Sequence, residues 1–255
     1  MKFVIIKKKW IALVVVAIIS MLMLSINYNG GANASVYFSN VPRLVPIYSV
    51  ETDKKQVAIS FDTAWGADKT MDIIKILKEY NVGATFFMVG FWVEEYPEMV
   101  KAIDEAGIEI GTHSNTHPDF TNLSEEQMKL ELTTSMDLIK NITGKDVKLF
   151  RAPYGAYNNT MLKLTDEMGL KTIQWDVDTL DWKGISGVEI CERVMSKVKN
   201  GSIILSHNNA DHVLDALPLL LERLLNAGYE VVSVGELIYQ EDYYIDNLGI
   251  QRKNS

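Results

Sequence analysis

Short apolar runs alternate with amphipathic segments along most of the chain. Residues 57–62 form a mostly apolar run that contains Ser60 and ends in Asp62, and residues 68–80 then place Ile73, Ile74 and Leu77 on one helical face. This alternation of strand and helix recurs about seven times before residue 239, a rhythm typical of a parallel sheet covered by helices. The sequence therefore predicts an α/β fold.

The same patterns predict where the other elements lie. Further strands are expected at 83–89, 108–113, 147–151, 171–177, 202–207 and 230–234. Further helices are expected at 97–106, 124–142, 159–168, 187–199 and 214–226, with a last helical turn at 235–239. The chain lacks a Gly-x-Gly-x-x-Gly motif and a phosphate loop, which argues against a doubly wound nucleotide-binding sheet. A closed or nearly closed, deformed (β/α) barrel of parallel strands fits the length better.

The N-terminal region differs from the rest in composition. A lysine-bearing stretch over residues 1–9 precedes an apolar run over 10–26, the pattern of a secretory signal or a membrane anchor. A small-x-small sequence at 32–34 would suit cleavage, so both alternatives stay open for residues 1–34. Either one places the protein outside the cytoplasmic membrane, anchored there or released to the cell wall. The expected organisation then has a linker at 35–54, a catalytic domain at 55–239 and a polar tail at 240–255.

Composition narrows the classes of partner and chemistry. The single cysteine, Cys191, excludes an intramolecular disulfide, and its helical pattern suggests a small buried side chain rather than a nucleophile. The formal net charge is −8 and the acidic and basic residues form no basic patch, which argues against nucleic acid as a partner. The sequence gives no basis for predicting an oligomeric state.

Titratable residues gather where the predicted strands end. These residues are Asp62, His113, Arg151, Asp181 and His207. In a barrel of parallel strands the carboxyl ends converge on one mouth, where catalytic groups sit. Each residue alone has a structural explanation: Asp62 could cap a helix, and His207 could be a hydrogen-bonded core histidine. Their recurrence at strand after strand favours a shared site.

Two of the four histidines lie four residues apart, at His113 and His117. One helical turn after the strand would bring both rings to the same side, and neutral imidazole is a common ligand of zinc. The alternative is a pair of solvated loop residues. The intervening residues, 114–116, include no glutamate, which excludes the His-Glu-x-x-His protease pattern.

Five motifs in order carry a resemblance to a known family. They are Ser-Phe-Asp62, His113-Ser-Asn-Thr-His117, Arg151-Ala-Pro-Tyr154, Asp178-Thr-Leu-Asp181-Trp182 and Leu205-Ser-His207. Together they resemble the polysaccharide deacetylase family, the NodB-homology domain or carbohydrate esterase family 4, over about residues 55–238. The version Phe-Asp-Thr-Ala-Trp-Gly66 resembles the sporulation-associated branch of Gram-positive spore formers. The resemblance implies a deformed barrel and metal-dependent removal of N-acetyl groups from glycans such as peptidoglycan or chitin.

The resemblance also implies a role for each motif residue. Asp62 corresponds to the general base and His207 to the general acid, while Arg151 orients the base and Asp181 tunes the acid. His113 and His117 would hold the divalent metal, zinc being expected and cobalt or manganese being alternatives. The expected substrate contacts are the backbone N–H near Tyr154 and the side chains of Trp182 and Leu205.

One position departs from the family pattern. The family has a second aspartate, a metal ligand, where this chain has Thr63. Three outcomes are open: Thr63 or water completes a weaker metal site, the nearby Asp68 replaces the missing carboxylate, or the metal is lost. The main hypothesis is therefore a metal-dependent deacetylase. The alternatives are a catalytically silent glycan-binding domain and a hydrolase of a non-sugar amide.

Overall fold

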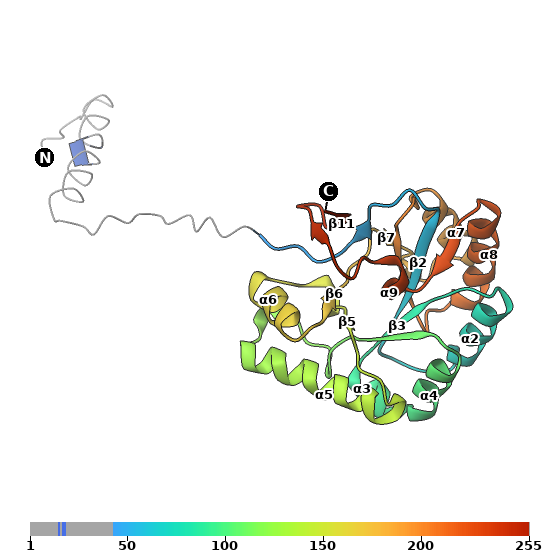
Figure 1. Ribbon diagram of the computed structural model, residues 1–255, viewed down its shortest axis with the longest axis horizontal. Coiled ribbons are helices and arrows are strands. Elements are labelled where there is room, and N and C mark those ends of the chain that lie inside the picture. The colour runs from blue at the N-terminus through green and yellow to red at the C-terminus, as the bar shows by residue number, and fades with distance from the viewer. Residues whose placement is uncertain (1–14, 16, 19–42, 255) are drawn as a thin grey trace, which may run out of the picture. The chain divides into compact units, whose positions relative to one another are not determined.

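A curled sheet of parallel strands forms the centre of the fold (Figure 1). The computed structural model describes residues 15, 17–18 and 43–254. Across the sheet the strands follow the order β6 (Lys171–Thr172), β5 (Leu149–Phe150), β4 (Glu109–Thr112), β3 (Thr85–Met88), β2 (Gln56–Thr63), β8 (Ile203–His207) and β7 (Val177–Asp178). A further strand, β9 (Glu230–Val232), pairs in parallel with the start of β2. The predicted deformed barrel of parallel strands is confirmed.

Helices follow the strands and lie outside the sheet (Figure 1). They are α2 (Thr70–Glu79), α3 (Gly90–Glu95), α4 (Pro97–Glu105), α5 (Glu125–Thr143), α6 (Asn159–Glu167), α7 (Gly187–Met195), α8 (Val213–Asn226) and α9 (Val234–Leu237). The described part of the chain also contains the 3-10 turns η1 (Phe120–Asn122), η2 (Pro153–Gly155) and η3 (Asp181–Lys183). The sequence patterns located these α-helices except α3, whose six residues are too few to show helical periodicity.

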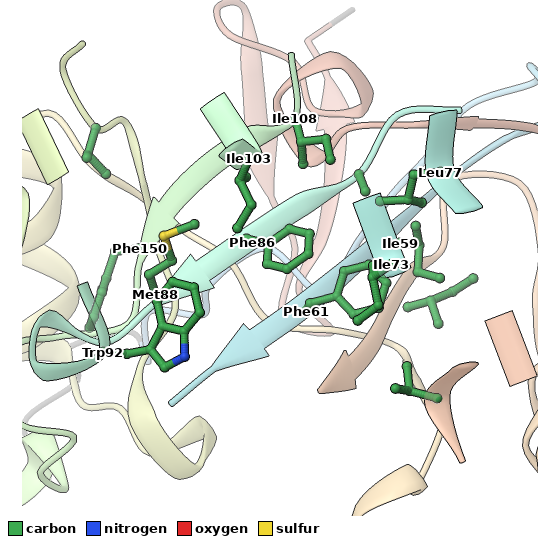
Figure 2. Close-up of a cluster of buried hydrophobic side chains, with 14 of the residues drawn as sticks. Ile59, Phe61, Ile73, Leu77, Phe86, Met88, Trp92, Ile103, Ile108 and Phe150 are labelled. Carbon is green, nitrogen blue, oxygen red and sulfur yellow. The ribbon is translucent and has the colours of Figure 1, made fainter. Parts of the chain in front are cut away.

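The two faces of β2 belong to different layers. Val57, Ile59 and Phe61 join the large cluster under the helices, where Phe61 lies 4.9 Å from the ring of Phe86 (Figure 2). On the other face, Ala58 joins the smaller cluster, while Ser60 and Asp62 contact the buried guanidinium of Arg151. This two-sided burial explains why the sequence of β2 is mostly apolar and does not alternate regularly with exposed polar residues.

One predicted strand is wrong in detail. Residues 171–177 were expected to form a single strand, but they form β6 and β7, which lie at opposite edges of the sheet. The chain between them crosses from one edge to the other, so it cannot continue either ladder. A run of apolar residues indicates a buried strand but does not indicate which neighbouring strand it pairs with.

Part of the expected linker packs against the barrel. Ile47 is buried, and its N–H and C=O bond to Thr172 O (3.0 Å) and to Gln174 N (2.7 Å). Further along, β1 (Ser49–Val50) is held by a 2.9 Å bond from Val50 N to Gly201 O. The segment 47–50 therefore connects the β6 side of the sheet to the start of β8.

The segment expected as a polar tail also has structure. β10 (Tyr243–Ile245) pairs antiparallel with β11 (Ile250–Lys253), and β11 pairs in parallel with β1. The buried amide of Gln251 bonds to both the N–H and the C=O of Tyr239, each at 2.8 Å. A buried polar side chain with both of its hydrogen bonds satisfied thus anchors this segment, and a search for apolar periodicity does not detect such an anchor.

The predicted signal or anchor, residues 1–34, lies almost entirely outside the described residues. Within residues 15, 17–18 and 43–254, no helix combines the length and apolarity that a membrane crossing requires.

Candidate active site

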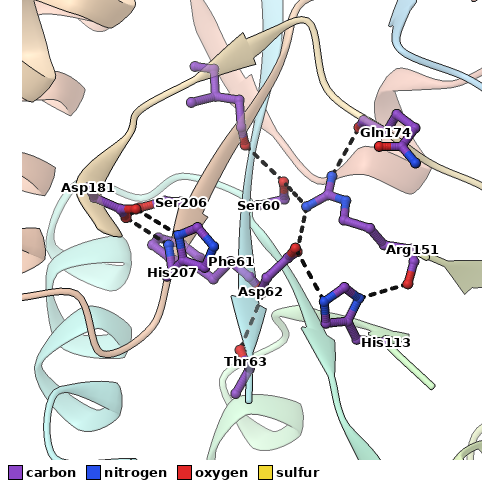
Figure 3. A network of polar contacts seen from close by, with 11 residues as sticks. Ser60, Phe61, Asp62, Thr63, His113, Arg151, Gln174, Asp181, Ser206 and His207 are labelled. Atoms are coloured by element: carbon purple, nitrogen blue, oxygen red, sulfur yellow. Dashed lines mark hydrogen bonds and ion pairs between the residues drawn. The ribbon is translucent and has the colours of Figure 1, made fainter. Parts of the chain in front are cut away.

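Asp62, the penultimate residue of β2, is the centre of a buried polar network (Figure 3). Its Oδ1 accepts a 2.8 Å bond from Arg151 Nη1, and its Oδ2 lies 3.5 Å from His113 Nε2. The guanidinium of Arg151 has no solvent exposure and also donates to Ser60 Oγ (2.8 Å) and Gln174 O (3.1 Å). These contacts fix the carboxylate of Asp62 in one orientation.

The network keeps Asp62 ionised. Burial by itself would raise the pKa of the carboxyl group, because desolvation disfavours the charged form. The charges of Arg151, His113 and His207 act in the opposite direction, together with the hydrogen bond from Arg151, and the pKa of Asp62 ends below its ordinary value. At neutral pH Asp62 is therefore a carboxylate that can accept a proton.

His207, at the end of β8, is paired with a second buried carboxylate (Figure 3). Its Nδ1 lies 2.6 Å from Asp181 Oδ1, and Asp181 Oδ2 accepts from Ser206 Oγ (2.6 Å) and from the His207 N–H (2.8 Å). Burial lowers the pKa of His207, but the hydrogen bond and charge of Asp181 outweigh it and raise the pKa above its ordinary value. Nε2 is left as the nitrogen that can face a substrate.

His113 and His117 lie close together, but not through the helical turn that the sequence predicted. No helical turn follows β4; instead Ser114 and His117 have positive φ angles of 72° and 60°. The two ring centroids are 4.9 Å apart. Sequence spacing alone could not predict these left-handed residues, because non-glycine residues seldom adopt them.

Both rings of this pair are electrically neutral at pH 7. Burial lowers the pKa of His113, and burial together with the charge of His113 lowers the pKa of His117 to about 4. His113 Nδ1 lies 2.7 Å from Arg151 O, which can only accept, so Nδ1 carries the proton and Nε2 keeps its lone pair. Among the described residues, no hydrogen-bond partner reaches the buried Nδ1 of His117. An orphaned imidazole nitrogen beside a second neutral imidazole fits a divalent cation.

Neither Thr63 nor Asp68 completes this pair of histidines. Thr63 is fully buried, and its hydroxyl donates to Phe61 O (3.3 Å). Asp68 lies beside Gly66 and is not among the residues that line the cavity. Across the described residues, no group of three or more histidine, cysteine, aspartate or glutamate side chains is placed to hold a metal. The donor set present therefore fits a cation that takes its other ligands from water or substrate.

A cavity of about 650 Å³ opens over these groups. Of the predicted site residues it is lined by Asp62, His113, His117, Tyr154, Trp182, Leu205 and His207. Arg151 and Asp181 do not line the cavity and lie behind this wall, in contact with Asp62 and His207. The structure thus brings the predicted strand-end residues to one mouth.

Sequence reasoning missed several lining residues. They are Ala64, Trp65, Trp175, Asn208, Asn209 and Ala210. Trp65 and Asn208 lie within three residues of Asp62 and His207, so their closeness to a strand-end acid or base was the available signal. Asp178, which the sequence placed in a motif without a role, also lines the cavity.

Comparison with known proteins agrees with this geometry. A family model described as polysaccharide deacetylase matches residues 49–173. A peptidoglycan-N-acetylglucosamine deacetylase of Bacillus cereus is 32% identical over 77% of this chain and 73% of its own length. The chain therefore belongs to the polysaccharide deacetylase family. Members of this family generally depend on a divalent metal ion.

Two further relatives bear on function. The uncharacterised protein YlxY of Bacillus subtilis is 33% identical over 76% of this chain, which spans only 60% of that relative. A solved structure from Bacillus anthracis, described as a family 4 carbohydrate esterase pseudoenzyme, is 35% identical with a TM-score of 0.74. That match covers 76% of this chain and 68% of the solved one. The family thus includes both named deacetylases and a named pseudoenzyme.

Proposed function

We propose that this protein hydrolyses N-acetyl groups of cell-wall glycan, releasing acetate and leaving a free amine on the sugar. The observation that carries the proposal is the pairing of Asp62 with Arg151 and of His207 with Asp181 at one cavity. The two pairs hold one residue as a base and the other as an acid at the same pH, which is what amide hydrolysis requires.

Each group has a distinct task in this reaction. Asp62 accepts the proton of the attacking water, because its pKa is held low enough for it to be ionised. His207 donates from Nε2 to the departing nitrogen, since Asp181 favours its protonated form. Without that proton the sugar nitrogen would have to leave as an amine anion. Arg151 and Asp181 are positioning residues, because they act only through Asp62 and His207.

His113 and His117 are the residues that would hold the metal, zinc being expected with cobalt or manganese as alternatives. When bound, a divalent ion supplies Lewis-acid polarisation of the acetamide oxygen and lowers the pKa of water. With Thr63 in place of an aspartate the cation would be held more weakly, because the site has one carboxylate ligand fewer.

The rest of the cavity would hold the sugar. Trp182 and Leu205 line it and are suited to contact the acetyl methyl group. The backbone N–H near Tyr154 is suited to stabilise the oxyanion that forms when water adds to the amide. An extracytoplasmic location is part of the proposal: it rests on the N-terminal sequence and on relatives named as peptidoglycan deacetylases.

The test is acetate release from peptidoglycan and from chitin oligomers by the purified chain. We expect release in the presence of zinc, cobalt or manganese, and its loss in Asp62→Asn, which keeps the shape of the side chain. The proposal would be refuted if the wild-type chain released no more acetate than Asp62→Asn with every one of these metals and glycans.

A second candidate is a glycan-binding domain without catalysis. It is favoured by Thr63 at the position of the family's ligand and by similarity to a named pseudoenzyme. Metal content separates the two candidates. One metal per chain that disappears in His113→Ala supports the hydrolase, whereas saccharide binding by a chain that retains no metal supports the binding domain.

A further inference from the structure

The indole of Trp65 stands exposed at the mouth of the cavity. It is 66% exposed yet lines the cavity, and its ring centroid lies 5.1 Å from that of His117. The two rings meet at 66°, so His117 does not stack face to face on the indole. Most of a large apolar surface is therefore left uncovered beside the reacting groups.

The loop that carries Trp65 is held in place from two sides. The carbonyl of the next residue, Gly66, accepts from Trp92 Nε1 (2.8 Å) and from Asn208 Nδ2 (2.9 Å). Both donors belong to buried residues, and Asn208 directly follows the proposed acid His207. Gly66 has a φ of +68°, and a Cβ there would collide with the side chain of Asn209. Hydrogen bonds from buried side chains thus fix the position of this loop.

Within the described residues, Trp65 is one of three exposed aromatic residues that line the cavity. Tyr154, 72% exposed, also contacts His117, with centroids 4.7 Å apart. Trp182, 59% exposed, follows Asp181 and therefore lies on the His207 side. The exposed rings thus flank both the imidazole pair and the proposed acid. Exposed apolar surface gathered at a cavity marks a binding site.

A pyranose ring matches this arrangement. Its axial C–H groups form an apolar face that packs on an aromatic ring, while its hydroxyls stay in water at the rim. One sugar is needed over Asp62 and His207, where its acetamide reacts. A second ring linked to that sugar would extend past the cavity wall.

We propose that Trp65 is a stacking platform for a neighbouring sugar ring, so that the site binds oligosaccharides in preference to single sugars. The inference rests on the proposed glycan substrate. It makes Trp65 a determinant of chain-length preference, separate from the groups that perform the hydrolysis.

A purely structural role would make a different prediction. If Trp65 only supported His117, its loss would weaken the binding of single sugars and oligosaccharides alike. A platform for the neighbouring ring affects only ligands long enough to reach it.

The test compares dissociation constants for N-acetylglucosamine and its tetramer, measured by calorimetry on the full chain with a chelator present to prevent turnover. In Trp65→Ala we expect tetramer affinity to fall about tenfold, as when one aromatic anchor is removed, with monosaccharide affinity unchanged. Trp65→Phe should keep most of the tetramer affinity. Tyr244→Ala, which removes a half-exposed aromatic residue of β10, is the matched control and should change neither value.

The outcomes are distinguishable. Unchanged tetramer affinity in Trp65→Ala, or an equal loss for both ligands, overturns the platform and leaves the proposed hydrolase intact. A wild-type chain that binds neither saccharide overturns the platform and also counts against the proposed function. Trp65→Leu, which retains more apolar volume at this position than alanine, provides the same comparison if Trp65→Ala fails to fold.

Discussion

Asp181 sets the charge of His207, and this contact can be tested without any activity assay. Asp181→Asn removes the nearest negative charge that raises the pKa of His207 and leaves the burial that lowers it. We expect the pKa of His207 to fall below that of the wild type. Titration of the His207 ring protons by NMR measures it. If the pKa of His207 in Asp181→Asn stays at the wild-type value, Asp181 is not the cause of the raised pKa.

The same pair has a pH-dependent effect on stability. Because the folded-state pKa of His207 is raised, the stabilisation is fully present below the unfolded pKa and is lost as pH rises through the folded one. The difference in free energy of unfolding between wild type and Asp181→Asn should therefore narrow at alkaline pH.

Arg151 neutralises a buried carboxylate, so its removal should be costly. In Arg151→Met the charge of Asp62 is left buried without its cation, and the free energy of unfolding at pH 7 should fall by about 3–5 kcal/mol. Since the folded pKa of Asp62 is lowered, its contribution is present above the unfolded pKa and lost as pH falls through the folded one. Urea unfolding measures both effects.

Arg151→Lys is the matched variant for this prediction. It keeps a cation but cannot reach Asp62, Ser60 and Gln174 with a planar fork, so it should recover only part of the stability. Arg151→Met with wild-type stability would contradict the account.

At the scale of the elements, the local pattern of apolar residues predicted the ends of β2 and β8 well. Their apolar runs end in Asp62 and His207, and parallel pairing places Asp62 opposite His207 in register. This is why strand-end residues could be found from the sequence. The orientation of Trp65 could not, because it depends on Trp92 and Asn208, which come from distant segments.

Two glycines with left-handed backbone test how tightly β1 docks. Gly144 and Gly201 have φ angles of +72° and +77°; a Cβ at Gly144 meets nothing within 4 Å, whereas one at Gly201 would collide with the carbonyl of Val50. Gly144→Ala should cost about 1–2 kcal/mol from backbone strain alone. Gly201→Ala should cost clearly more, because β1 must also shift. Equal losses in thermal or urea unfolding would show that the contact with β1 is loose.

For the whole molecule, the alternating pattern was sufficient to predict a parallel, barrel-like sheet. It could not predict how the β6 edge is joined to the start of β8, because segment 47–50 does this through backbone hydrogen bonds as well as through the buried side chains of Ile47 and Val50. Likewise β10 and β11 are short, and Gln251 anchors them through side-chain hydrogen bonds to Tyr239 in addition to the packing of Ile245. The contributions missed are those that depend on hydrogen-bond partners, which leave no periodic trace in a sequence.

The central claim is that this molecule is a working hydrolase although Thr63 replaces a ligand. Acetate release from chitin oligomers, measured side by side for wild type, Asp62→Asn and Thr63→Asp with added metal, tests it most directly. We predict that wild type exceeds Asp62→Asn by about 10²–10⁴-fold, the range for loss of a general base, and that Thr63→Asp is faster still at low metal. Wild type equal to Asp62→Asn, with only Thr63→Asp active, would contradict the claim.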